Sequence, residues 1–275
     1  MVSVNIGALR VIQPPVIEGV CINLATQNDA IEAAITRAAR GDGFSLFTLN
    51  LDHLVKLRAS AAFRRAYGSA GLISADGAPI VWLARRQGAA VERTTGADLV
   101  EPLSAQAAAR GLSVYVVGPG PIAQEAGLAR LKATYPDLII AGAETPMVPG
   151  DDNGLAPTFD VDALAERINA SGARLCLLCL GAPKQELLAE ALNRRCPTVG
   201  FLGVGAALDF IAGEVSRAPR WMQVTGFEWT WRLISQPRRL GLRYARCALL
   251  FGELAIKSMI RQDRDPPAPM PEPAR

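Results

Sequence analysis

Histidine is almost absent from the sequence, and cysteine is sparse and scattered. His53 is the only histidine among 275 residues, which argues against a histidine-based zinc site or a Ser–His–Asp triad. Its helical spacing after Asn50 instead predicts a packing role. The five cysteines are odd in number, which argues against a disulfide framework and favours a reducing, cytoplasmic setting. Cys176 and Cys179 lie in a predicted buried strand, where positions three apart face opposite sides, so neither a metal nor a redox role is predicted for them.

Long apolar runs are also missing. The longest one near the C-terminus, residues 247–256, is interrupted by Gly252 and Glu253 and is too short to span a bilayer. The first residues show no basic start followed by an apolar run, so no signal peptide is predicted. Residues 263–275 are proline-rich and are predicted to be disordered.

Short apolar runs alternate with amphipathic patterns along the rest of the chain, which predicts strands and helices in alternation. The predicted strands are residues 19–24, 44–49, 72–75, 112–117, 138–141, 174–180 and 198–204. The predicted helices are residues 28–39, 52–66, 78–86, 97–110, 121–134, 161–170 and 184–194. Units of about 25–35 residues are typical of βαβ crossovers. The sequence therefore predicts an α/β fold, with a Rossmann-like, mostly parallel sheet flanked by helices.

Polar and glycine-rich segments follow five of the predicted strands. In parallel sheets, ligands bind beyond the carboxyl ends of the strands, so these segments are expected to meet at one binding site. They contain Thr48 and Asn50, Asp76 and Gly77, Gly118 and Gly120, the run from Gly181 to Gln185, and the run from Gly203 to Asp209.

The two last segments suit an anionic or nucleotide ligand. Lys184 and Gln185 follow Gly181 at the start of a predicted helix, beside free N–H groups that favour an anion; an ordinary helix start remains the alternative. Gly203 and Gly205 allow a ligand to approach the backbone closely. Asp209 is expected to hydrogen-bond a ribose or base, or to cap the following turn.

Three further charged sites have two interpretations each. Asp76 at a strand end suits a general base if burial raises its pKa, although an Asp-Gly turn is common. Arg93 suits a phosphate clamp or an ion pair. Asp151 and Asp152 suit a divalent ion, but a solvated acidic loop is the favoured interpretation, so no metal site is predicted.

The C-terminal segment is unusually basic and aromatic. Between Arg217 and Arg264 there are ten basic and three acidic residues, a net charge of +7 against +3 for the whole chain. Bases interleaved with aromatic residues are typical of an interfacial membrane helix or of a clamp for anions. Nucleic-acid binding and an ordinary helical cap on the domain are the alternatives.

Several of these motifs together resemble the WecG/TagA/CpsF glycosyltransferases, also called glycosyltransferase family 26. The resemblance extends in order over about residues 44 to 245. The matching blocks are residues 47–50, 74–77, 92–99, 180–186, 203–213, 217–221, 228–233, 236–239 and 243–244.

The resemblance implies an inverting, metal-independent transfer of a sugar from a nucleoside-diphosphate donor to a polyprenyl-diphosphate-linked acceptor. It implies a general base at Asp76 and no cofactor. It places polar pocket residues at Thr48, Asn50, Arg93 and Gln185. It also places the arginines that meet the diphosphate at Arg232, Arg239 and Arg243.

The resemblance further implies a peripheral position on the inner face of the plasma membrane and no nucleic-acid partner, with monomer and homo-oligomer both open. Trp229, Trp231 and Phe251 are expected to touch lipid. Residues 1–215 are predicted to form the glycosyltransferase domain, and residues 216–262 a helical, membrane-associating C-terminal appendage.

The sequence departs from the family pattern in two places, at residues 206–208 and near residues 144–146. Both departures leave the donor sugar open. A nicotinamide-dependent oxidoreductase is one alternative, although the dinucleotide fingerprint is incomplete. A non-catalytic membrane-binding module is the other.

Overall fold

The computed structural model describes residues 13–264, apart from the side chains of Val224, Arg239 and residues 261–264. Its centre is a sheet of six strands in the order β4-β3-β10-β9-β5-β6, and every neighbouring pair is parallel. The strands are β3 (Phe44–Leu49), β4 (Leu72–Ala75), β5 (Ser113–Val117), β6 (Ile139–Glu144), β9 (Leu175–Leu178) and β10 (Gly200–Gly203). The predicted parallel α/β architecture is confirmed.

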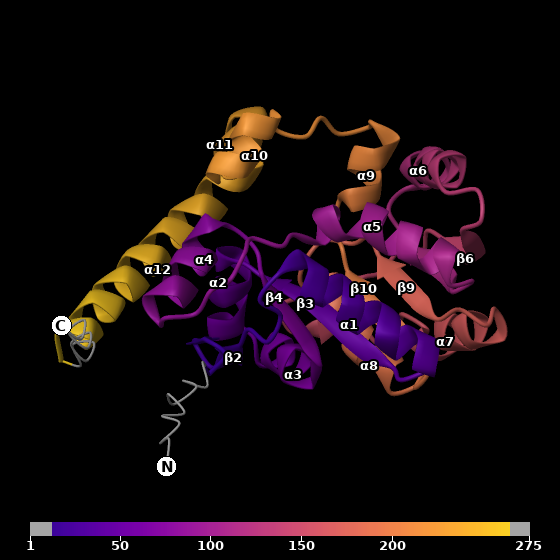
Figure 1. The fold of residues 1–275 in the computed structure, drawn as a ribbon, viewed down its shortest axis with the longest axis horizontal. Helices are drawn as coiled ribbons and strands as arrows, with labels where there is room; N and C mark the ends of the chain where they lie inside the picture. Colours follow the sequence, from indigo (N-terminus) through magenta and orange to yellow (C-terminus); the bar gives the residue numbers. More distant parts are fainter. Residues whose placement is uncertain (1–12, 265–275) are drawn as a thin grey trace, which may run out of the picture.

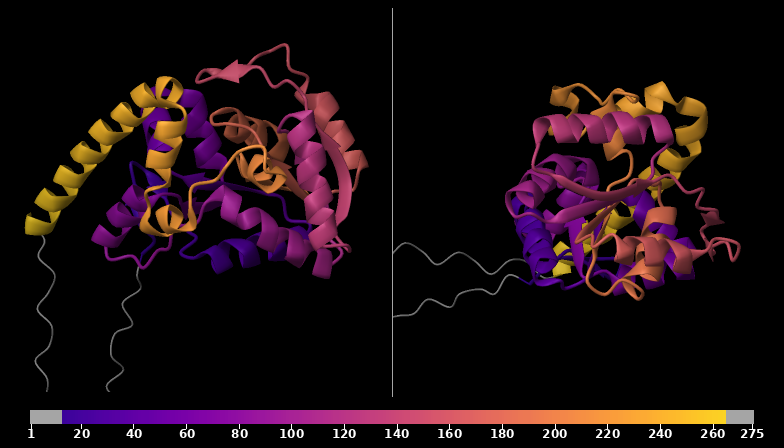
Figure 2. Two further views of the ribbon diagram at one scale, coloured as in Figure 1. Left: turned by 90° about the horizontal axis from the view of Figure 1, so that it is seen from above. Right: turned by 90° about the vertical axis from the view of Figure 1, so that its right-hand side faces the viewer.

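Helices cover both faces of this sheet (Figures 1 and 2). One face packs against α1 (Gln27–Arg40), α5 (Gly96–Ala109), α6 (Pro121–Thr134) and α9 (Ala207–Ala212). The other packs against α2 (Leu51–Ala59), α3 (Ala61–Ser69), α4 (Ala78–Arg86), α7 (Val161–Ala170) and α8 (Lys184–Asn193).

Strand residues alternate between the two cores because successive side chains of a strand point to opposite faces. Phe47 and Leu49 belong to one core, whereas Phe44 and Leu46 belong to the other. Cys176 and Cys179 are likewise buried in different cores. The predicted opposite facing of these two cysteines is confirmed.

Two predictions about local structure are wrong. Residues 19–24 do not form a strand of the main sheet. Instead, β2 (Val20–Cys21) pairs with β1 (Val16–Ile17) in a small antiparallel hairpin, and Leu24 alone bridges to Ser74. The predicted helix 52–66 is divided at Ser60, whose extended backbone ends α2 and whose hydroxyl accepts a hydrogen bond from Phe63 N to begin α3.

Where the sequence predicted an acidic loop at Asp151 and Asp152, the chain forms a further short hairpin, β7 (Gly150–Asp151) with β8 (Gly154–Leu155). The chain then ends in three helices, α10 (Arg220–Thr225), α11 (Glu228–Ser235) and the long α12 (Pro237–Arg264). In Figure 1 an extended segment leads from α9 to α10 and α11, and α12 runs along one side of the molecule.

Helix α12 packs on α2 and α4 through a mixed apolar and ionic contact. Leu250 and Leu254 are buried in the core, and Phe251 meets Trp82 edge to face at a centroid distance of 5.6 Å. Arg58 Nη1 of α2 lies 2.7 Å from Glu253 Oε2 of α12. Phe251 is therefore partly buried against the domain, and its expected contact with lipid stays a prediction. Within residues 13–264, no helix is long and apolar enough to cross a membrane.

Candidate active site

A cavity of about 350 Å³ opens at the carboxyl ends of β3, β4, β9 and β10. Small-molecule sites typically have volumes of about 300–1,000 Å³. The C-terminal helices close its other side, because Trp229, Arg232 and Tyr244 also line it. The predicted convergence is therefore confirmed for four of the five strand ends, whereas Gly118 and Gly120 after β5 do not line the cavity. The appendage contributes to the same cavity.

Asp76 directly follows β4 and lines the cavity. Its backbone N–H donates to Leu49 O at 2.7 Å, which fixes it against the end of the neighbouring strand β3. Burial raises the pKa of its carboxyl to about 6, and the nearby Arg232 and Arg93 oppose that rise. A carboxylate with this pKa is ionised at neutral pH and is a stronger base than an ordinary aspartate.

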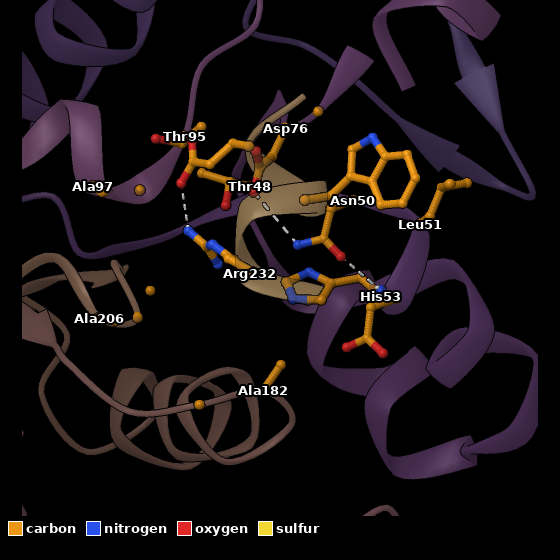
Figure 3. A pocket seen from close by; sticks show the side chains of 18 of the residues that line it. Thr48, Asn50, Leu51, His53, Asp76, Thr95, Ala97, Ala182, Ala206 and Arg232 are labelled. Atoms are coloured by element: carbon orange, nitrogen blue, oxygen red, sulfur yellow. Dashed lines mark hydrogen bonds and ion pairs between the residues drawn. The ribbon is translucent and has the colours of Figure 1, made fainter. Parts of the chain in front are cut away.

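Asn50 has two roles at the end of β3. Its Oδ1 accepts a hydrogen bond from His53 N at 3.0 Å and so caps helix α2. Because Oδ1 is engaged there, the amide nitrogen lies toward Asp76, with Nδ2 3.5 Å from Asp76 Oδ2. Figure 3 shows Asn50 between Asp76 and His53, with the nearby buried Thr48 also lining the cavity.

Gln185 supports the glycine loop that follows β10. Its Oε1 accepts from Gly205 N at 3.0 Å, and its Nε2 donates to the buried Glu186 Oε1 at 2.8 Å. A Cβ at Gly203 would lie 2.9 Å from Gln185 Nε2, so a larger residue at position 203 would displace the Gln185 amide. Gly181, Gly203, Gly205 and Gln185 all line the cavity.

Two residues predicted to bind the nucleotide do not line the cavity. Lys184 precedes Gln185 at the start of α8, and Asp209 lies in the first turn of α9. Phe210 lines the cavity from α9 instead. Adjacent residues of a helix point about 100° apart, which explains why neighbouring positions differ in this way. The predicted roles of Lys184 and Asp209 stay predictions.

The three appendage arginines that were expected to meet the diphosphate differ in whether they line the cavity. Arg232 lines the cavity, and Figure 3 shows its side chain among the labelled residues of that cavity. Arg243 also lines it, and its Nη2 lies 2.8 Å from Asp52 Oδ2. The side chain of Arg239 lies outside the described part of the structure.

An ionic cluster joins the appendage to the domain beside Asp76. Arg93 Nη2 and Arg217 Nη2 lie 3.3 and 2.6 Å from opposite oxygens of Asp98. Glu228 Oε1 lies 2.7 Å from Arg232 Nη2, and Glu228 Oε2 lies 3.8 Å from each of Arg93 and Arg217. The sequence prediction missed Asp98 and Glu228, because the run of bases shows charge without showing which acids compensate it.

His53 is a packing residue that also borders the cavity. It is buried, and its Nδ1 lies 2.6 Å from the hydroxyl of Tyr67. Burial lowers its pKa to about 3, so the ring is neutral at physiological pH. The predicted packing role is confirmed.

Asp151 lies in the β7–β8 hairpin and does not line the cavity. Within residues 13–264, no group of three or more His, Cys, Asp or Glu side chains is arranged to hold a metal ion.

Residues 16–265 match the model of the glycosyl transferase WecG/TagA/CpsF family. The match includes the cavity, the ionic cluster and the whole appendage. The chain belongs to the WecG/TagA/CpsF family of glycosyltransferases.

Proposed function

We propose that this glycosyltransferase moves a sugar from a nucleoside-diphosphate donor to a polyprenyl-diphosphate-linked saccharide, in the synthesis of a bacterial cell-surface polysaccharide. The donor is proposed to be a UDP-hexose or UDP-N-acetylmannosamine. The observation that carries the proposal is a partly buried carboxylate, Asp76, that lines the same cavity as three arginines. A base and a set of cations are the two things that this transfer needs.

Asp76 acts as the general base in the proposed reaction. Its carboxylate takes the proton from the attacking hydroxyl of the acceptor sugar while that oxygen forms a bond to the anomeric carbon of the donor. The bond from the anomeric carbon to the diphosphate oxygen breaks at the same time. Attack from the face opposite the leaving group inverts the anomeric configuration.

The leaving nucleoside diphosphate gains one negative charge as its bond to the sugar breaks. Arg232, Arg93 and Arg243 line the cavity, and charge-assisted hydrogen bonds from guanidinium groups stabilise a diphosphate strongly. We therefore propose that the arginines supply the charge stabilisation without a metal ion. The loops at Gly181 and at Gly203 to Gly205 let the nucleotide approach the backbone closely.

The outer face of α12 supports a peripheral position on the inner face of the plasma membrane. Its exposed apolar residues, Leu242, Leu249, Ile256 and Ile260, lie at intervals of seven, seven and four, which places them in one stripe. The buried Leu250 and Leu254 occupy the opposite face. An apolar stripe near arginines fits an interfacial helix on an anionic membrane.

The experiment that tests the function is a screen of sugar nucleotides against a short polyprenyl-diphosphate-sugar acceptor. Product formation and release of UDP or GDP are measured together, so that simple hydrolysis of the donor is distinguished from transfer. Transfer with one donor supports the proposal. Binding of NAD(P)H without any transfer would instead favour the oxidoreductase alternative.

Asp76→Asn is the informative variant in this screen, because it keeps the shape of the side chain and removes the base. Asp151→Asn is its matched control, since Asp151 is exposed in the β7–β8 hairpin. Full activity of Asp76→Asn would exclude Asp76 as the base.

A further inference from the structure

Glu228 lies at the centre of three arginines that come from three different segments. It is the first residue of α11, and its side chain is 14% exposed. Arg93 precedes α5, Arg217 precedes α10, and Arg232 lies one turn along α11. Three guanidinium groups repel one another unless an anion lies between them, and Glu228 is that anion together with Asp98.

Among the described side chains, Glu228 is the one that forms an ion pair with Arg232. The two side chains are four residues apart on one helix, with Oε1 and Nη2 separated by 2.7 Å. A glutamate placed four residues before a basic residue is the favourable orientation in a helix. Arg232 also stacks over the Phe210 ring, at 5.6 Å from the ring centroid, and Arg217 lies 5.7 Å from the same centroid.

The cluster holds spare hydrogen-bond donors. Each arginine has five N–H donors, and the two carboxylates of Glu228 and Asp98 take only part of them. Arg217 Nε is buried and has no hydrogen-bond partner within the described residues, but Arg217 does not line the cavity, so the donors available to a ligand are those of Arg93 and Arg232. The three arginines and two acids leave a net charge of +1, which favours a further anionic ligand.

We propose that Glu228 is a positioning residue that holds Arg93 and Arg232 beside Asp76, with Arg217 bracing the cluster from outside the cavity, so that the free donors of Arg93 and Arg232 face one diphosphate group. The inference rests on the proposed function and adds to it a residue that does not itself touch the substrate. Glu228 acts by holding the arginines in place, and it takes no part in the proton transfer.

The charges around Asp76 give this proposal a distinctive readout. Arg232 and Arg93 lower the pKa of Asp76, Asn50 lowers it through its hydrogen bond, and Glu228 raises it by a smaller effect. If Glu228 holds Arg232, its removal lets Arg232 move away, and the pKa of Asp76 rises. If Glu228 acted only as a distant charge, its removal would lower the pKa of Asp76.

Glu228→Ala and Glu228→Gln separate these cases. Alanine removes both the charge and the hydrogen-bond acceptor, so the acid limb of the pH–rate profile is expected to move to higher pH. Glutamine keeps a neutral acceptor for Arg232 while removing the charge, so its acid limb is expected at or below that of the wild type. For Glu228→Ala, kcat is expected to fall about tenfold, as for the loss of one charge-assisted contact.

Glu190→Ala and Glu190→Gln are the matched controls. Glu190 also pairs with an arginine four residues later, with 2.8 Å between Glu190 Oε1 and Arg194 Nη2, but Arg194 is 73% exposed and neither residue lines the cavity. These variants are expected to keep the wild-type rate and pH profile. Any change that the Glu190 and Glu228 variants have in common is a general effect of losing an ion pair within a helix.

A second measurement does not require activity. The rate at which phenylglyoxal modifies each arginine, followed by peptide mass spectrometry, reports how firmly that side chain is held. In Glu228→Ala, modification of Arg217 and Arg232 is expected to be several-fold faster than in the wild type, whereas Glu190→Ala changes only Arg194.

Each outcome decides the proposal. Unchanged modification rates in a folded Glu228→Ala overturn it, and so does an acid limb that moves to lower pH or stays in place. If Glu228→Ala does not fold, the modification rate of Arg232 in Glu228→Gln decides instead, because a neutral amide holds a guanidinium more weakly than a carboxylate does; a rate equal to that of the wild type overturns the proposal. A wild type that forms no glycosyl product refutes the proposed function, and the modification rates then still decide whether Glu228 holds the arginines.

Discussion

The pKa of Asp76 predicts how transfer depends on pH. Burial raises that pKa from 3.8 to about 6, a difference worth about 3 kcal/mol between the two protonation states. The base is active when deprotonated, so kcat/KM is expected to rise with pH and to level off above about 7. Between pH 7 and pH 5 the deprotonated fraction falls about tenfold, whereas an aspartate of ordinary pKa would lose almost nothing.

The assay is kcat/KM against pH with a water-soluble acceptor, because kcat/KM reports the groups of the free enzyme. Arg232 is the largest influence that lowers the pKa of Asp76. Arg232→Gln is therefore expected to move the acid limb to higher pH, apart from any loss of rate. A profile that is flat from pH 5 to 7, or an unmoved acid limb in Arg232→Gln, would refute the reasoning.

Three further predictions concern stability and membrane binding. Burial raises the pKa of Glu186 to about 7, so the free energy of unfolding is expected to fall as pH rises from about 4.5 to 7. In urea unfolding, Glu186→Gln should remove this pH dependence and raise the free energy of unfolding at pH 8 by on the order of 3 kcal/mol. Gly96→Ala should destabilise the fold by about 2 kcal/mol in the same assay, because its Cβ would lie 2.8 Å from Gly203 O and from Val204 Cα; unchanged stability would contradict that close contact. Leu249→Glu should weaken sedimentation with anionic vesicles about tenfold, whereas Ala248→Glu, exposed on the same helix but off the apolar stripe, is expected to have a smaller effect.

The sheet and most of its helices are predictable because their signals are local. Buried strands such as residues 44–49 are continuous apolar runs, and helix starts carry capping residues. The approach of Asn50 to Asp76 also follows from the sequence, since β3 and β4 are parallel neighbours and both residues lie just past their ends. Secondary structure and parallel pairing are together sufficient to predict that contact.

Two of the three misses depend on contacts between residues that are distant in the chain, and one depends on a local cap. Residues 19–24 have strand-like composition, but their pairing is decided by β1 and by Ser74. The division at Ser60 depends on one serine acting as a cap within a helical pattern. The role of Glu228 depends on arginines 135 and 11 positions before it in the chain, Arg93 and Arg217, and a run of basic residues does not show such partners.

Glycosyl transfer by Asp76→Asn, measured beside the wild type and Asp151→Asn with the donor found in the screen, tests the central claim most directly. We predict that the wild type and Asp151→Asn form the lipid-linked product at similar rates. Asp76→Asn is expected to bind UDP as the wild type does and to lose transfer by at least about a hundredfold, the usual contribution of a general base. Transfer by Asp76→Asn at the wild-type rate would contradict the account.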